Sequence, residues 1–102
     1  MSEEKLLRLL QKKRGFFEAI LDLSEDELHL PIPDWISVLE QKKVLLSCID
    51  EIDHELSPFQ ARLHSLSQDV TEELAKTRSV VERILHLDTR NQEFRRKMLR
   101  DE

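Results

Sequence analysis

The chain of 102 residues has few of the residues that turn a polypeptide, with one glycine and three prolines. β-Hairpins, bulges and glycine-rich phosphate loops depend on such residues, so sheet folds and nucleotide cradles are excluded. Hydrophobic residues still make up 39% of the chain, which excludes a fully disordered polypeptide. The composition therefore predicts one all-α domain over residues 1–102.

Cysteine is also scarce, since Cys48 is the only one. A single thiol cannot form an internal disulfide and suits a reducing compartment. The charged N-terminal residues are unlike a signal peptide, and no apolar run approaches the about 18 residues of a membrane span. We therefore expect a cytoplasmic protein without a membrane span.

A basic face is missing as well. The net charge is −5, and residues 15–56 carry eleven acidic and only two basic side chains. A C-terminal basic run (Arg95, Arg96, Lys97, Arg100) is better explained as pairing with a helix macrodipole. The charge distribution therefore predicts no nucleic-acid partner.

Three helices are predicted, at about residues 2–29, 34–56 and 58–100. Ser2 is a suitable N-cap for the first, and Ser24 with Glu27 matches a capping box near its end. Two prolines make residues 30–33 an extended connector, after which Asp34 caps the second helix. Ser57 as N-cap and Pro58 at the first helical position begin the third.

Two of these helices carry a seam, a row of apolar positions spaced alternately three and four residues apart. The second helix has Trp35, Val38, Lys42, Leu45, Ile49, Ile52 and Leu56, with Leu39 and Leu46 widening the row. The third has Phe59, Leu63, Leu66, Val70, Glu73, Thr77, Val80, Ile84, Leu87, Asn91, Phe94 and Met98. These seams predict coiled-coil-like packing in an antiparallel three-helix bundle or helical hairpin. Asn91 either sets the pairing register or marks a kink near Asp88.

The predicted lengths leave part of the third helix without cover. A turn at residues 57–58 makes the last two helices an antiparallel hairpin, so the second helix covers the third only to about Val80. About 20 residues would then overhang by about 30 Å. An apolar stripe of that length must fold back, dimerise or bind a partner.

The sequence gives only weak indications of catalysis or metal binding. Glu51 and His54 have the spacing of a di-iron helix motif but flank the seam instead of lying on it. Cys48 has acidic neighbours and no base to activate its thiol. We expect no enzyme activity, no catalytic residue, no cofactor and no metal site.

Three segments carry a resemblance to a known family: residues 17–24 (FEAILDLS), 39–53 (LEQKKVLLSCIDEID) and 84–92 (ILHLDTRNQ). The pattern resembles small bacterial flagellar export chaperones of the FlgN/FliT type. The resemblance implies a cytoplasmic, all-helical protein that holds an export substrate. The substrate would be the C-terminal helix of a hook-filament junction or filament-cap protein, kept unpolymerised before type III export.

Such a function requires an apolar groove that accepts an amphipathic helix. On the overhang, the predicted partner-binding residues are Ile84, Leu87, Phe94 and Met98, with Leu6 and Leu10 as a second wall. Two alternatives remain open. One is a structural module that forms a homodimer or higher oligomer through the overhang, and the other is a regulator that sequesters a transcription factor.

Overall fold

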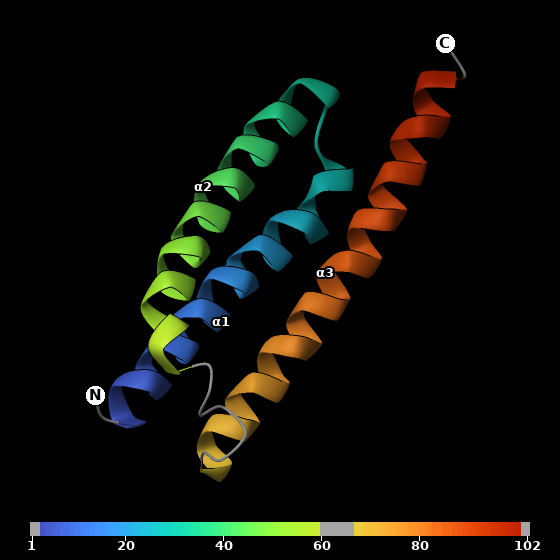
Figure 1. Ribbon diagram of the computed structural model, residues 1–102. Coiled ribbons are helices and arrows are strands. Elements are labelled where there is room, and N and C mark those ends of the chain that lie inside the picture. The colour runs from blue at the N-terminus through green and yellow to red at the C-terminus, as the bar shows by residue number, and fades with distance from the viewer. Residues whose placement is uncertain (1–2, 60–66, 101–102) are drawn as a thin grey trace.

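The computed structural model describes residues 3–59 and 67–100 and is elongated, measuring 55 × 20 × 18 Å. Its elements are α1 (Glu3–Asp26), the 3-10 turn η1 (Glu27–His29), α2 (Ile32–Leu56) and α3 (Gln68–Arg100), as Figure 1 shows. Within these two ranges there is no strand. The predicted all-α class is confirmed.

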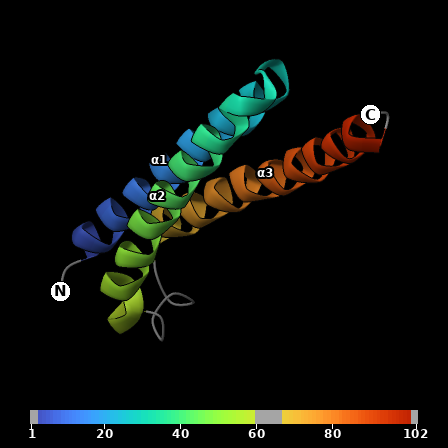
Figure 2. The ribbon, with the colours of Figure 1, turned by 90° about the horizontal axis from the view of Figure 1, so that it is seen from above.

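The central helix of the bundle is α1. It packs closely against both α2 and α3, whereas the backbones of α2 and α3 hardly approach each other (Figure 1). Toward its C-terminal end α3 diverges from the α1–α2 pair, most clearly in Figure 2. The prediction that α2 and α3 form a directly packed hairpin is therefore wrong.

The connection from η1 to α2 is shorter than predicted. Leu30 and Pro31 have extended backbones, and α2 begins at Ile32. Pro33 falls in the first turn of α2, where the missing N–H of proline costs nothing. Asp34 lies inside that turn instead of capping it, and its N–H donates to Pro31 O over 2.9 Å.

The end of α2 also differs from the prediction. Residues 57–59 continue the chain as a 3-10 turn, and the Ser57 N–H donates to the carbonyl of His54. Ser57 therefore ends one helix instead of capping the next, and α3 begins at Gln68 instead of residue 58. The predicted N-cap Ser2 and the seam residues Leu63 and Leu66 lie outside the described residues.

The predicted seams form the inward faces. Every seam position of α2 is buried or half-buried, and so are the described seam positions of α3 from Val70 to Asn91. One apolar cluster lies near the N-terminal end of α1 and contains Leu6, Leu9, Leu10, Ile52, Leu56, Phe59 and Val70. A second lies midway along the bundle and joins Ile20, Ile49 and Ile84.

The long overhang of α3 is absent. Ile84 is buried in the middle cluster, and the Asn91 side chain donates from Nδ2 to the carbonyl of Ser24 over 3.1 Å. One turn further on, Arg95 forms an ion pair with Glu27. Since α1 and η1 cover α3 to this level, the predicted 30 Å overhang is wrong. The helix runs through Asp88 without interruption, so Asn91 acts in pairing and not at a break.

Candidate functional site

The structure separates the six residues predicted to bind a partner. Leu6 and Leu10 are buried in the first apolar cluster, and Ile84 is buried in the second. Leu87 is half-buried. Only Phe94 and Met98 are exposed, by 42% and 38%. Leu6, Leu10 and Ile84 are thus part of the packing that holds the bundle together, and they form no common surface with Phe94 and Met98.

An ionic network takes the place of an apolar core at the η1 end of the bundle. Glu27 is only 1% exposed, and its Oε1 lies 3.2 Å from Lys42 Nζ. The same Nζ lies 3.3 Å from Asp88 Oδ1, and Arg95 Nη2 pairs with Glu27 Oε2. We call Glu27, Lys42, Asp88 and Arg95 the ionic network. It joins η1, α2 and α3.

Neighbouring polar groups support this network. The Ser24 hydroxyl donates to Asp88 Oδ1 over 3.3 Å, and the Ser24 carbonyl accepts from Asn91. The capping-box interpretation of Ser24 and Glu27 is therefore wrong, because both side chains bond across the bundle. The guanidinium of Arg95 lies 5.0 Å from the centroid of the Trp35 ring, in a cation–π contact.

The Trp35 ring is itself held in place, because its Nε1 donates to the carbonyl of Leu30 over 3.0 Å. Trp35 is buried, so the tryptophan covers one side of the Arg95 guanidinium. Trp35 therefore acts here as packing for the ionic network, as its seam position predicts.

An open groove of about 230 Å³ lies beside this network, between α2 and α3. We call it the α2/α3 groove. Leu39, Lys42, Lys43 and Leu46 of α2 line it together with Asp88, Gln92 and Arg95 of α3 and Glu27 of η1. Leu39 and Leu46 are 41% and 48% exposed. The groove thus has an ionic base and aliphatic side chains along one wall.

The two leucines belong to a second apolar stripe along α2. Ile32, Ile36, Leu39 and Leu46 follow one another at alternating steps of four and three residues, with Lys43 at the intervening position. At 3.6 residues per turn the stripe lies roughly a third of a turn from the buried seam. All four apolar members are exposed, so no described part of the chain covers them. This leaves α2 with a second, unpartnered face.

Other parts of the surface are less suited to binding an apolar helix than the α2/α3 groove is. A pocket of about 190 Å³ beside Phe94 is lined by Leu28, Arg90, Glu93 and Lys97, so it holds mostly charged side chains. On the opposite end, Arg14 donates to the buried seam residue Glu73 and lies 2.6 Å from Glu18. Glu73 and then Glu18 raise the pKa of the Arg14 guanidinium by hydrogen bonding. That pair fixes α1 against α3.

Glu51, His54 and Cys48, the residues considered for metal binding or catalysis, all lie on α2. Glu51 and His54 are both exposed on the outside of α2, and no group of three potential ligands gathers among residues 3–59 and 67–100. Cys48 is a free, half-buried thiol. No helix in the described part of the chain has the length and apolar character to cross a membrane.

The groove was not predicted from the sequence. Its cations and carboxylates come from η1, α2 and α3, so only the fold brings them together. Part of the signal was nonetheless present, because Leu39 and Leu46 widen the apolar face of α2 beyond one seam. Read with Ile32 and Ile36, they indicate a second stripe.

Comparison with known proteins adds no family assignment. No family model matches the chain. No curated protein and no solved structure matches it either.

Proposed function

We propose that this chain is a cytoplasmic chaperone that holds an amphipathic helix of a partner protein in the α2/α3 groove. In line with the resemblance of its sequence, the partner is the C-terminal helix of a flagellar hook-filament junction or filament-cap protein awaiting type III export. The groove takes over the role predicted for the overhang of α3.

One observation carries the proposal, namely the uncovered stripe of α2. It extends over the fifteen residues from Ile32 to Leu46, whose fourteen steps of 1.5 Å span about 21 Å. The stripe has four exposed aliphatic side chains on one face of α2, beside a groove. Their spacing of three and four residues is the one at which helices contact each other. The groove of about 230 Å³ beside the stripe offers space for side chains of that helix.

The position of the groove also suits a chaperone that must release its substrate. The apolar clusters that hold the fold together lie elsewhere, around Leu10 and Ile49. Binding at the stripe therefore does not require the protein core to open. Full burial of one leucine gives about 1.5–3 kcal/mol, so two to four such contacts support reversible binding.

The test is a fluorescence anisotropy titration with labelled C-terminal peptides of hook-filament junction and filament-cap proteins. We expect L39D and L46D each to weaken binding at least about tenfold, because each removes a buried leucine contact and introduces a charge. V44D is the matched control. Val44 is 64% exposed on α2 but lies roughly a third of a turn from the stripe, on the side away from the seam.

Equal affinity of L39D, L46D and the unmodified chain would contradict the proposal. Circular dichroism of each variant checks that the helices remain. Sedimentation over a range of concentrations tests the alternative of an oligomerisation module. If no peptide binds, and a dimer forms that L46D abolishes, then the stripe pairs two copies of the chain and holds no substrate.

A further inference from the structure

The α2/α3 groove is lined by three cations, Lys42, Lys43 and Arg95, and by only two carboxylates. Its two carboxylates are both engaged: Glu27 by Lys42 and Arg95, and Asp88 by Lys42 and Ser24. Its three cations have donors to spare. An ammonium group has three N–H donors and a guanidinium five, and these partners use only a few of them.

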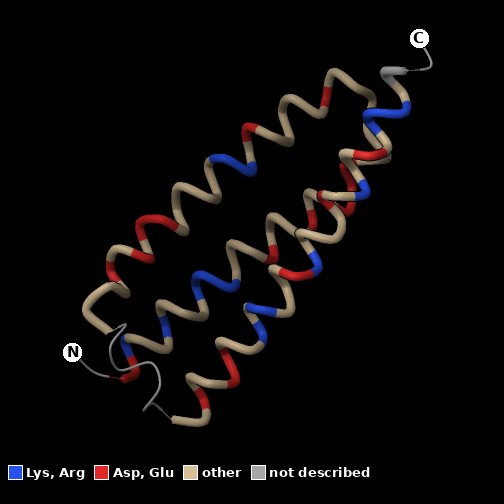
Figure 3. The backbone as a smooth tube through the Cα atoms, turned by 45° about the vertical axis from the view of Figure 1, so that its right-hand side comes forward, with Lys and Arg blue, Asp and Glu red and all other residues tan. Residues whose placement is uncertain are grey.

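Two of the unused donors are specific. Arg95 Nε is buried and has no hydrogen-bond partner among the residues that the structure describes; the same holds for the acceptor Glu27 Oε2, which is engaged by Arg95 Nη2 as an ion pair. Lys43 lines the groove between Leu39 and Leu46 on the stripe and is exposed. Within residues 3–59 and 67–100, no ion pair engages its ammonium group. The two adjacent lysines, 42 and 43, are the blue segment in the middle of α2 in Figure 3, with acidic positions before and after it.

The Lys43 ammonium group is exposed in the free chain and loses contact with water when a partner helix covers the groove, and a carboxylate is the acceptor that compensates this loss best. Leu39 and Leu46 flank Lys43 along one wall of the groove, so aliphatic side chains on either side of the carboxylate would complement that wall. From this combination we infer that the groove selects a partner helix bearing a carboxylate between two aliphatic side chains that lie seven residues apart. That spacing matches Leu39 and Leu46, with the carboxylate opposite Lys43.

This inference rests on the proposed function and names the chemistry of the helix that is held. A second copy of the chain fits less well. Lys43 is the one charged residue among the positions of its own stripe, so pairing stripe to stripe would offer the Lys43 ammonium group no carboxylate from those positions. The charge in the groove therefore favours an acidic amphipathic partner over the chain itself.

The test uses two labelled, designed amphipathic peptides of about 20 residues, a length at which a helix begins to be stable alone. Both have leucines seven positions apart, and they differ only in having glutamate or glutamine at the position between them. We expect the glutamate peptide to bind about tenfold more tightly, the effect of one charge-assisted hydrogen bond. The overall charge of the chain predicts the opposite result. Its net charge of −5 would repel the glutamate peptide, so the glutamine peptide would bind more tightly.

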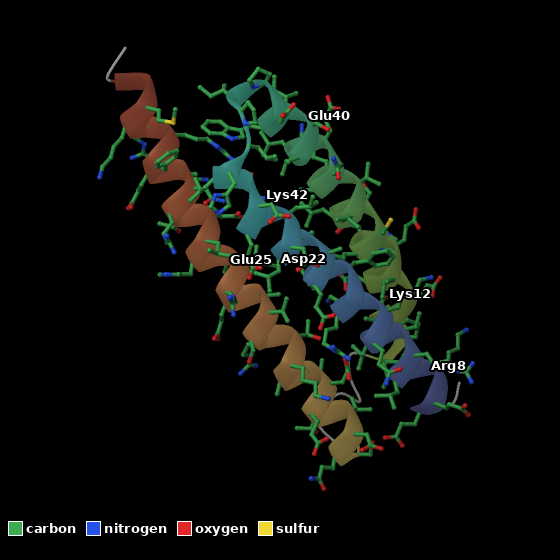
Figure 4. The ribbon with its side chains drawn as sticks, turned by 180° about the vertical axis from the view of Figure 1, so that it is seen from behind. Arg8, Lys12, Asp22, Glu25, Glu40 and Lys42 are labelled. Atoms are coloured by element: carbon green, nitrogen blue, oxygen red, sulfur yellow. The ribbon has the colours of Figure 1, made fainter. Side chains whose placement is uncertain are left out.

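The variant K43Q should remove the difference between the two peptides, whereas K12Q should leave it unchanged. Lys12 is exposed on α1, and Figure 4 shows it on a different part of the bundle from Lys42. Equal binding of both peptides to the unmodified chain would overturn the inference and leave the proposed function standing. Binding of neither peptide at about 1 mM would overturn the proposed function and the inference with it.

Discussion

Replacing Glu27 by glutamine removes one negative charge from the ionic network and keeps the shape of the side chain. Glu27 is 1% exposed and is the shared partner of Lys42 and Arg95. The variant E27Q therefore leaves two cations facing a neutral amide at the η1 end of the bundle. It tests whether this network holds α2 and α3 to η1 or is only a surface feature.

The expected loss of stability depends on which interactions Lys42 and Arg95 keep in the variant. Breaking a fully buried pair by removing one partner costs about 3–5 kcal/mol. Lys42 still has Asp88 at 3.3 Å, and Arg95 still lies over the Trp35 ring. Both cations also retain some access to solvent. We therefore expect E27Q to lower the free energy of unfolding by about 2–3 kcal/mol.

The assay is equilibrium unfolding in urea, followed by far-UV circular dichroism and by tryptophan fluorescence. Trp35 is the only tryptophan and lies 5.0 Å from the Arg95 guanidinium, so its emission reports directly on the network. A loss of 2–3 kcal/mol corresponds to a fall in melting temperature of about 10–20 °C for a domain of this size.

The matched control is E25Q, two residues away. Glu25 pairs with Arg83 over 3.1 Å, but the two side chains are 41% and 66% exposed (Figure 4 labels Glu25). Such exposed pairs contribute less than about 1 kcal/mol, so E25Q should be nearly neutral. If E27Q destabilises the protein no more than E25Q does, the reasoning about the ionic network is refuted.

Two further predictions concern α1. Gly15 lies inside this helix, and a Cβ atom there would have nothing within 4 Å; G15A should therefore raise the free energy of unfolding by about 0.5–1 kcal/mol in the same urea assay, and a loss would contradict it. The pKa of Glu3 is lowered because its carboxylate accepts hydrogen bonds from the side chain and backbone N–H of Ser67. The stabilisation from Glu3 is therefore present above the ordinary pKa of glutamate and is lost as the pH falls through the lowered folded-state value. Urea unfolding should show a smaller acid-induced loss of stability in E3Q than in the unmodified chain, and identical pH profiles would contradict the assignment.

The inward faces of the helices could be predicted from periodicity alone. Seam positions such as Ile49 and Ile84 are buried as expected, because a residue must face the core when its neighbours at three and four positions do. Even the polar seam residues follow the pattern. Lys42, Glu73 and Asn91 are buried, and each meets a polar partner on another element. Periodicity, however, does not specify which helix packs against which.

Which helices pack against each other, and where each helix begins and ends, could be determined only from the structure. Ser57 and Pro58 have the local chemistry of a helix start, but a 3-10 turn that extends α2 occupies that place. Because α1 lies in the centre of the bundle, α1 and η1 together contact α3 as far as Arg95. This is why Ile84 is buried, whereas an uncovered apolar stripe lies on α2. Local propensities compete with tertiary contacts at such points, and the contacts decide.

The central claim is that the uncovered stripe of α2 and the facing side of α3 hold a helix. The most direct measurement is the change in backbone amide chemical shifts when a client peptide is titrated into the isotope-labelled chain. The account predicts the largest changes at the groove residues Leu39, Lys43, Leu46 and Gln92, with little change around the core residue Leu10. Changes confined to Phe94 and Met98 would contradict it and would place the partner at the end of α3 instead.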